Sequence, residues 1–463
     1  AAKAALLAGV DMETPDPDAF LHLQALVEGG ELAETAIDHA VRRVLRLKFR
    51  LGLFEKPYVD AALADAKVGA DASQRFARDV AEKSMVLLKN DGTLPLNAGK
   101  IKKLAVIGPH ADETLLGGYS SIPRQTVSIY QGLKQKLQGK AEVVFARGTL
   151  LTKPLPAAPA SSAEQVFALA DVRQRSEHAG TFSMQRWNHD DIALAIDQDR
   201  QGLLDEAVTL AKSADAVVLV LGENEGLSRE AWADKHLGDR TSLQLVGNQL
   251  QLANALLATG KPVVLVLQNG RPLALGELAQ TMPAIIESWY LGQETGSAVA
   301  NVLFGDVNPS GKLPLTFPRS AGHIPSYYNH KASAKRGYLF DDISPLYPFG
   351  HGLSYTSFSY SDLKIDASQA KANGEVRISL RVRNSGQRDG TEVVQLYIND
   401  PVASVTRPVQ QLKGFARLAL KRGEQARVSF TLPVNLLAFF DQAMRWVVEP
   451  GEISVQLGSS SAD

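Results

Sequence analysis

Residues 216–221 read AVVLVL and form the strongest structural signal in this 463-residue chain. All six are apolar, without the alternation typical of a strand that has one face in water. Four other short runs share this character: 104–108 (LAVIG), 143–146 (VVFA), 262–267 (PVVLVL) and 284–288 (AIIES). Helical periodicities separate the runs, at 203–212, 247–259 and 296–303. The pattern predicts an α/β domain with a mostly parallel sheet that helices cover on both faces.

The regions on either side of this domain have different patterns. Residues 33–53 carry an apolar stripe at helical spacing beside a basic face, but the first 60 residues make a poor core alone. After residue 360, apolar and polar residues alternate, which predicts a small antiparallel β-sandwich. The alternating segments are 376–384, 392–398, 426–432 and 453–457. The last of them has no successor to pair with before Asp463, so we expect that a further strand is missing.

Composition excludes several classes of function. Lys and Arg number 49 against 50 Asp and Glu, a net charge of −1, so binding to nucleic acid or anionic membranes by bulk charge is not expected. No apolar run reaches the roughly 18 residues of a membrane span. The chain has no Cys, and its nine His show no metal-ligand spacing. The sequence also contains no phosphate-binding glycine motif and no G-x-S-x-G nucleophile turn.

One acidic loop follows the 216–221 run. The segment GENEGLSRE at 222–230 places Glu223, Glu225 and Glu230 just beyond a strand end, where ligands bind in parallel α/β sheets. A carboxyl group in such a loop is a plausible proton donor, because partial burial raises its pKa toward neutrality. The alternative is a set of solvated loop acids paired with Arg229 and Arg240. The residues alone do not separate the three carboxyl groups.

Longer segments resemble glycoside hydrolase family 3, and bacterial β-glucosidases and β-xylosidases above all. These segments are SMVLLKNDGTLPL (84–96), GENEGLSREA (222–231), KPVVLVLQNGRPLAL (261–275), the run from WYLGQETG to LPLTFPRS (289–320) and PLYPFGHGLSYTSF (345–358). The resemblance implies four parts. They are the tail of a (β/α)8-type barrel domain at 1–60, an α/β sandwich at 61–320, a connection at 321–360 and a fibronectin type III-like β-sandwich at 361–463.

The resemblance also implies a retaining mechanism, in which two carboxyl groups roughly 5–5.5 Å apart share the chemistry. The acid/base role falls on Glu230, while Glu223 and Glu225 are expected to position the loop or pair with cations. The segment 232–240 is longer than in relatives, which affects the loop's conformation. The nucleophilic Asp belongs to a barrel segment upstream of this chain, and Asp11 is expected to be structural. We therefore expect this polypeptide alone to lack activity and to need an N-terminal barrel portion as its partner.

Tyr119 and Arg124 lie beyond the 104–108 run, where they are predicted to contact a β-linked oligosaccharide or aryl glycoside, with helix capping and packing as the alternative. Trp187 is predicted to stack on a sugar face, with a buried anchoring role as the alternative. The expected activity is exo-acting release of terminal nonreducing β-D-glucosyl residues, with a β-xylosidase or a dual glucosidase/xylosidase as the alternative. An alternative of another class is a noncatalytic carbohydrate-binding or scaffold protein that lacks the nucleophile domain. The mechanism needs no cofactor or metal, and the family suggests a periplasmic or secreted location.

Overall fold

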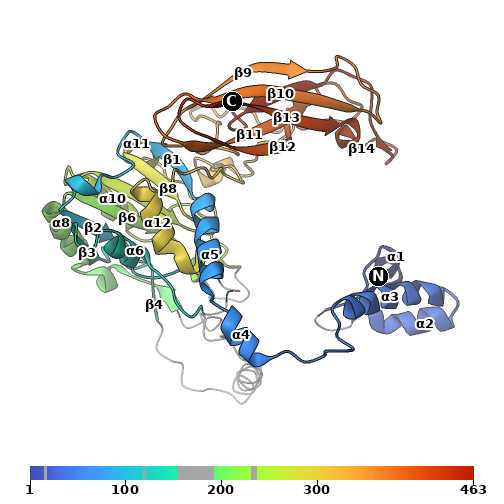
Figure 1. Cartoon of the computed structure of the whole chain (residues 1–463), viewed down its shortest axis with the longest axis horizontal. Helices are drawn as coiled ribbons and strands as arrows, with labels where there is room; N and C mark the ends of the chain where they lie inside the picture. Colours follow the sequence, from blue (N-terminus) through green and yellow to red (C-terminus); the bar gives the residue numbers. More distant parts are fainter. Residues whose placement is uncertain (15–17, 118–119, 121–122, 155–191, 231–236) are drawn as a thin grey trace. The chain divides into compact units, whose positions relative to one another are not determined.

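The computed structural model describes residues 1–463 except 15–17, 118–119, 121–122, 155–191 and 231–236. The chain divides into two compact units, Ala1–Ala70 and Asp71–Asp463 (Figure 1). The second unit contains both the α/β domain and the β-sandwich.

The first unit is a small helical body. Its helices are α1 (Ala2–Leu7), α2 (Leu23–Glu28), α3 (Glu34–Arg50) and α4 (Ala61–Lys67). Its buried core consists of Leu6, Leu32 and Ala40, with partly buried apolar neighbours. Asp11 accepts hydrogen bonds from Nε of Arg43 on α3 at 2.8 and 2.9 Å, which gives Asp11 a structural contact. That this unit is the tail of a barrel domain stays a prediction.

The α/β domain contains a six-stranded sheet in the order β1-β8-β7-β6-β2-β3. Its strands are β1 (Val86–Asn90), β2 (Lys103–Ile107), β3 (Glu142–Ala146), β6 (Ala216–Gly222), β7 (Val263–Gln268) and β8 (Ala284–Glu287). The five strands expected from apolar runs pair in parallel, whereas the edge strand β1 is antiparallel to β8. The predicted mostly parallel sheet is confirmed, and β1 is an addition that the run pattern did not identify.

Helices cover both faces of this sheet. Along β6, Val217, Leu219 and Leu221 face one core, while Val218 and Val220 face the other. The first core also contains residues of α8, α10 and α11, and the second contains residues of α5, α6 and α12. The helices are α5 (Asp71–Ser84), α6 (Ile129–Lys136), α8 (Leu203–Ser213), α10 (Gln249–Leu257), α11 (Leu278–Thr281) and α12 (Thr295–Leu303). Burial on both faces explains why the central strands are uniformly apolar.

The C-terminal part is a β-sandwich of two antiparallel sheets, β13-β10-β9 and β12-β11-β16, drawn in orange to red in Figure 1. Its strands are β9 (Phe358–Ile365), β10 (Glu375–Asn384), β11 (Gly390–Asn399), β12 (Gln411–Leu420), β13 (Gln425–Pro433) and β16 (Ser454–Gly458). Alternate residues of the two sheets form one core. The last strand, β16, pairs with β11, which precedes it in the sequence. The further strand that the sequence leads us to expect after β16 stays a prediction.

Polar contacts join the sandwich to the α/β domain. Nζ of Lys312 lies 3.0 Å from Oε1 of Glu392 on β11, and both side chains are largely buried. Nη2 of Arg417 on β12 donates to Oγ of Ser310 at 2.8 Å. These contacts tie the end of the α/β domain to two adjacent strands of one sandwich sheet.

Candidate functional site

The carboxyl ends of β2, β3, β6 and β7 lie at one edge of the sheet because these strands are parallel. The chain runs from β2 to its neighbour β3 and later places β6 on the other side of β2. In open α/β sheets, ligands bind beyond the carboxyl ends of the strands, at the point where the strand order reverses. A cleft of about 550 Å³ lies here. Its lining includes Pro109 and His110 after β2, Arg147 after β3, and Asn224, Glu225 and Gly226 after β6.

The acidic loop leaves this edge through a turn at Gly222. Its φ is +142°, and a Cβ at this position would lie 1.9 Å from the carbonyl oxygen of Gln268 on β7. The side chain of Gln249 fixes the turn from α10. Its Oε1 accepts from the Gly222 amide at 2.8 Å, and its Nε2 donates to the Gly222 carbonyl at 3.0 Å. The close approach of β6 to β7 therefore requires glycine and sets the direction in which the loop departs.

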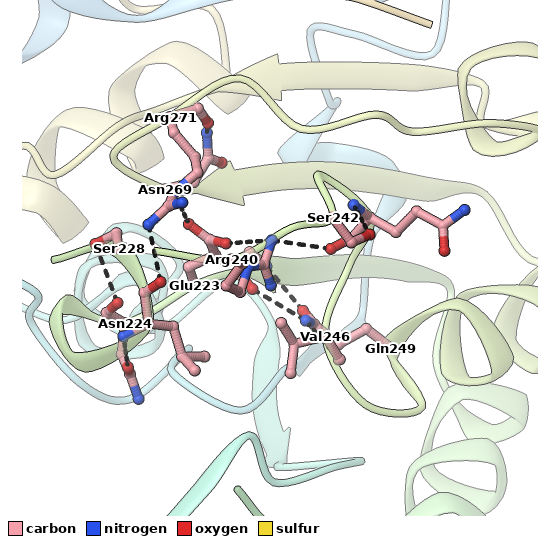
Figure 2. Close-up of polar contacts among 12 residues, drawn as sticks. Glu223, Asn224, Ser228, Arg240, Ser242, Val246, Gln249, Asn269 and Arg271 are labelled. Atoms are coloured by element: carbon pink, nitrogen blue, oxygen red, sulfur yellow. Dashed lines mark hydrogen bonds and ion pairs between the residues drawn. The ribbon is translucent and has the colours of Figure 1, made fainter. Parts of the chain in front are cut away.

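Glu223, the next residue, carries a wholly buried carboxylate between two arginines (Figure 2). Its Oε1 lies 2.6 Å from Nη2 of Arg240, and its Oε2 lies 3.3 Å from Nε of Arg271. Neither carboxylate oxygen has a hydrogen-bond partner among the described residues. Charge attraction to the two guanidinium groups is therefore the main interaction of Glu223. Burial raises the pKa of Glu223, and the two guanidinium groups oppose that rise.

Glu225 has a different role, since it holds a neighbouring loop. Its Oε1 accepts hydrogen bonds from the backbone amides of Leu116 at 3.1 Å and Gly117 at 2.8 Å. Glu225 begins the short helix α9 (Glu225–Ser228), and Oδ1 of Asn224 accepts from the Leu227 amide to cap it. Glu225 therefore joins the loop after β6 to the loop after β2 across the cleft.

Glu230 follows the point where the outgoing and returning sides of the acidic loop come together. The carbonyl of Arg229 accepts from the amide of Asp239 at 3.2 Å, and Nε of Arg229 donates to the carbonyl of Leu237 at 3.2 Å. These bonds draw the outgoing and returning chain together. The side chain of Glu230 is exposed, and this residue immediately precedes residues 231–236, which lie outside the described part of the chain. Of the three loop carboxyl groups, Glu230 is the most exposed, since Glu223 is buried and Glu225 is partly buried.

Residues after β7 and β8 support α9 from the other side. The hydroxyl of Tyr290 lies 3.0 Å from Oγ of Ser228 and donates to the carbonyl of Glu223 at 3.3 Å. Nη2 of Arg271 donates to the carbonyl of Leu227 at 2.9 Å. Burial is the main cause that raises the pKa of Tyr290, which keeps its proton for these contacts.

A second buried carboxyl group, Glu287, ends β8. Nδ2 of Asn269 donates to its Oε2 at 3.0 Å, and the amide of Trp289 donates to its Oε1 at 2.9 Å. Complete burial raises the pKa of Glu287 to about 8, although both hydrogen bonds favour the charged form. The group is therefore mostly protonated at pH 7. Nδ2 of Asn269 also donates to the carbonyl of Arg271, which joins Glu287 to the 269–271 turn.

The structure separates the residues predicted from sequence. The three loop carboxyl groups diverge: Glu223 faces the arginines, Glu225 binds the backbone across the cleft, and Glu230 faces solvent. Arg124 is exposed in the segment before α6. Tyr119 and Trp187 lie outside the described residues, and their predicted sugar contacts stay predictions.

Sequence reasoning misses the support that residues from other strands give to the loop. It suggests Arg240 as a partner of the loop acids, but it does not connect Arg271, Tyr290 or Gln249 with Glu223 or Gly222. The available signal is the shared sheet edge, because Arg271 and Tyr290 each follow a parallel strand on the β7 side of β6. Only the three-dimensional arrangement shows which of the polar residues at that edge meet.

The described residues contain neither a candidate metal site nor a candidate membrane-spanning helix. No three His, Asp or Glu side chains in that part of the chain form a group able to hold a metal ion. None of its helices combines the length and the apolar character that crossing a membrane requires.

Comparison with protein families matches two consecutive parts of the chain. Residues 85–355 match the glycosyl hydrolase family 3 C-terminal domain. Residues 392–461 match a fibronectin type III-like domain. The first match contains the α/β sheet and the acidic loop, and the second contains most of the β-sandwich.

Relatives and solved structures agree with these matches. The chain is 39% identical over 484 residues to the periplasmic beta-glucosidase of Salmonella typhimurium, covering 100% of this chain and 59% of the relative. It is 40% identical over 438 residues to a beta-xylosidase of Formosa agariphila, covering 92% and 54%. A β-glucosidase structure from Erythrobacter marinus superposes with a TM-score of 0.84 at 39% identity, covering 99% and 58%.

A further solved structure extends the agreement. The β-glucosidase of Listeria innocua in complex with glucose has a TM-score of 0.77 at 32% identity, covering 100% of this chain and 58% of that one. The chain thus spans less than three fifths of the length of these relatives. Because the family match extends over more than half of its residues, with the predicted sheet and sandwich in the same order, the chain belongs to glycosyl hydrolase family 3.

Proposed function

We propose that this chain is the acid/base-bearing part of a retaining, exo-acting β-glucosidase that removes terminal nonreducing β-D-glucosyl residues from oligosaccharides. The observation that carries the proposal is the position of Glu230. It is an exposed carboxyl group on a loop that buried ion pairs and backbone hydrogen bonds hold at the ligand edge of the sheet. Membership of a glycoside hydrolase family supplies the reaction class.

In the proposed reaction, Glu230 acts twice. Its carboxyl group first donates a proton to the glycosidic oxygen while an Asp of the N-terminal portion forms a bond to the anomeric carbon and the leaving alcohol departs. The resulting Glu230 carboxylate then takes a proton from water. That water attacks the anomeric carbon, which releases glucose and restores the Asp.

A β-xylosidase is the second candidate, because relatives of nearly equal identity have that name. The ratio of kcat/KM for p-nitrophenyl β-glucoside and β-xyloside decides between them. A periplasmic or secreted location is proposed from the name of the Salmonella relative. If the complete protein hydrolyses neither glycoside, a noncatalytic carbohydrate-binding or scaffold protein is the remaining hypothesis.

The first experiment compares this 463-residue chain with the complete enzyme, which includes the N-terminal portion. We expect p-nitrophenyl β-glucoside hydrolysis by the complete enzyme and none by the chain alone, because the proposal assigns the nucleophile to the N-terminal portion. Normal turnover by the chain alone, lost on Glu230→Ala, would overturn this division of the catalytic pair.

The second experiment tests Glu230 in the complete enzyme. Glu230→Gln should lower kcat/KM for alkyl glucosides by roughly 10²–10⁴-fold, because their leaving groups need a proton. The loss for dinitrophenyl glucoside, whose leaving group departs as an anion, should be under about threefold. Azide should restore turnover of the trapped intermediate and yield β-glucosyl azide. Glu142→Gln, at an exposed carboxyl group on β3, is the matched control and should behave as wild type. Equal losses on both substrates by Glu230→Gln would refute the assignment.

A further inference from the structure

The loop from residue 223 to residue 240, here called the acid loop, is closed at its base by buried charge. Glu223 is its first residue and Arg240 its last, and Oε1 and Nη2 lie 2.6 Å apart. The Glu223 side chain is 0% exposed and that of Arg240 is 15% exposed. Arg240 also donates through Nη2 to the carbonyl of Gln244 at 3.1 Å, which anchors the returning chain. The ion pair thus joins the two ends of the segment that contains Glu230.

Because the Glu223–Arg240 pair is largely buried, it is harder to separate than a surface ion pair. Exposed pairs contribute little because water and salt screen them. Separating Glu223 from Arg240 would instead leave a buried carboxylate with one partner fewer, which is strongly unfavourable. The Asp239 amide and the Arg229 carbonyl add a backbone bond to the same base. The base of the acid loop is therefore fixed by both an ion pair and a backbone hydrogen bond.

Arg271 connects this base to the adjacent strand. Its Nε lies 3.3 Å from Oε2 of Glu223, and its Nη2 donates to the carbonyl of Leu227 at 2.9 Å. Leu227 is in α9, which ends at Ser228, two residues before Glu230. One guanidinium group thus holds both the start of the acid loop and the helix that leads to Glu230.

We propose that Glu223, Arg240 and Arg271 form a clamp of positioning residues that holds Glu230 where it protonates the leaving group. This inference rests on the proposed function, and it assigns no contact between the clamp and the substrate. Displacing a reacting group by about 1 Å costs on the order of 10²-fold in rate. Loosening the clamp should therefore act on proton donation, while nucleophilic attack by the N-terminal portion is retained.

The test measures kcat/KM of the complete enzyme for aryl and alkyl glucosides whose leaving groups differ in pKa. In Glu223→Gln and Arg240→Gln, we expect losses of about 30–100-fold for methyl glucoside and under about threefold for dinitrophenyl glucoside. Arg240→Lys keeps the charge and should recover at least part of the methyl glucoside activity. It also serves as the test if the glutamine variants do not fold.

The matched control is Glu392→Gln, which breaks the largely buried pair with Lys312 away from the acid loop. It should lower thermal stability and change kcat/KM equally for all leaving groups. The clamp variants could lose kcat/KM equally for all leaving groups, while Glu230→Gln loses kcat/KM selectively for glucosides with poor leaving groups. That result would overturn the clamp and leave the assignment of Glu230 standing. A selective loss in the clamp variants without one in Glu230→Gln would overturn the assignment of Glu230 and move the positioned acid elsewhere on the loop. Selective losses in neither would overturn both.

Discussion

At the scale of single residues, Glu287 couples the stability of the α/β domain to pH. It is wholly buried at the end of β8, and burial raises its pKa from 4.5 to about 8. Between these values the folded protein holds a proton that the unfolded chain releases. Stability from this group is therefore complete below pH 4.5 and decreases as pH rises toward 8, by about 1.4 kcal/mol per pH unit.

Glu287→Gln should remove this pH dependence. Between pH 5.5 and 7.5, the free energy of unfolding of the wild type should fall by about 3 kcal/mol more than that of the variant. At pH 5.5 the variant should be less stable by about 1–3 kcal/mol, because an amide nitrogen cannot accept one of the two hydrogen bonds that Glu287 receives. Urea unfolding at both pH values measures the difference. Glu277→Gln, at an exposed position, should keep the wild-type dependence. A Glu287→Gln variant with that same dependence would refute the assignment.

At the scale of elements, the packing of β6 against β7 depends on Gly222. We expect Gly222→Ala to lower the free energy of unfolding by roughly 3–5 kcal/mol, since the new Cβ meets the Gln268 carbonyl and φ is +142°. Gly292→Ala is the matched control, because φ is +80° there and no atom lies within 4 Å of the position that a Cβ would take. The control should lose only about 1–2 kcal/mol from backbone strain. Equal losses in the two variants, measured by urea unfolding, would show that the close approach is unimportant.

Elements also differ in how well the sequence predicts them. The five parallel strands are predicted to within a residue or two, because an uninterrupted apolar run at that length is explained by burial on both faces. The edge strand β1 ends in Lys89 and Asn90, and β12 is interrupted by Gly414, so neither has a clear period. The place of the acid loop after β6 is predictable, but its contacts with Arg271 are not. These contacts depend on which strands lie beside β6 in the sheet, and no local sequence pattern encodes that strand order.

At the scale of the second unit, two domains share polar contacts, of which the Lys312–Glu392 pair is largely buried. The Lys312–Glu392 pair, with side chains 12% and 7% exposed, lies between the end of the α/β domain and β11. Nδ2 of Asn308 donates to the Asp389 carbonyl at 2.9 Å, a further bond between the two domains. Both domains have their own apolar cores, so such contacts decide whether they unfold together. Because breaking a buried pair costs about 3–5 kcal/mol, loss of this one should weaken that coupling.

We therefore expect calorimetry of this chain to show one main transition for the α/β domain and the sandwich, and two for Glu392→Gln. The sandwich transition should move down by roughly 10 °C or more, because a domain of this size shifts by several degrees per kcal/mol. Asp362→Asn is the control. Asp362 pairs with Arg427 on the exposed face of the sandwich, and asparagine tolerates its φ of +61°. That variant should keep the single transition, since exposed pairs contribute about 0–1 kcal/mol. Two transitions in the wild type, or none gained in Glu392→Gln, would show that the apolar cores alone set the cooperativity.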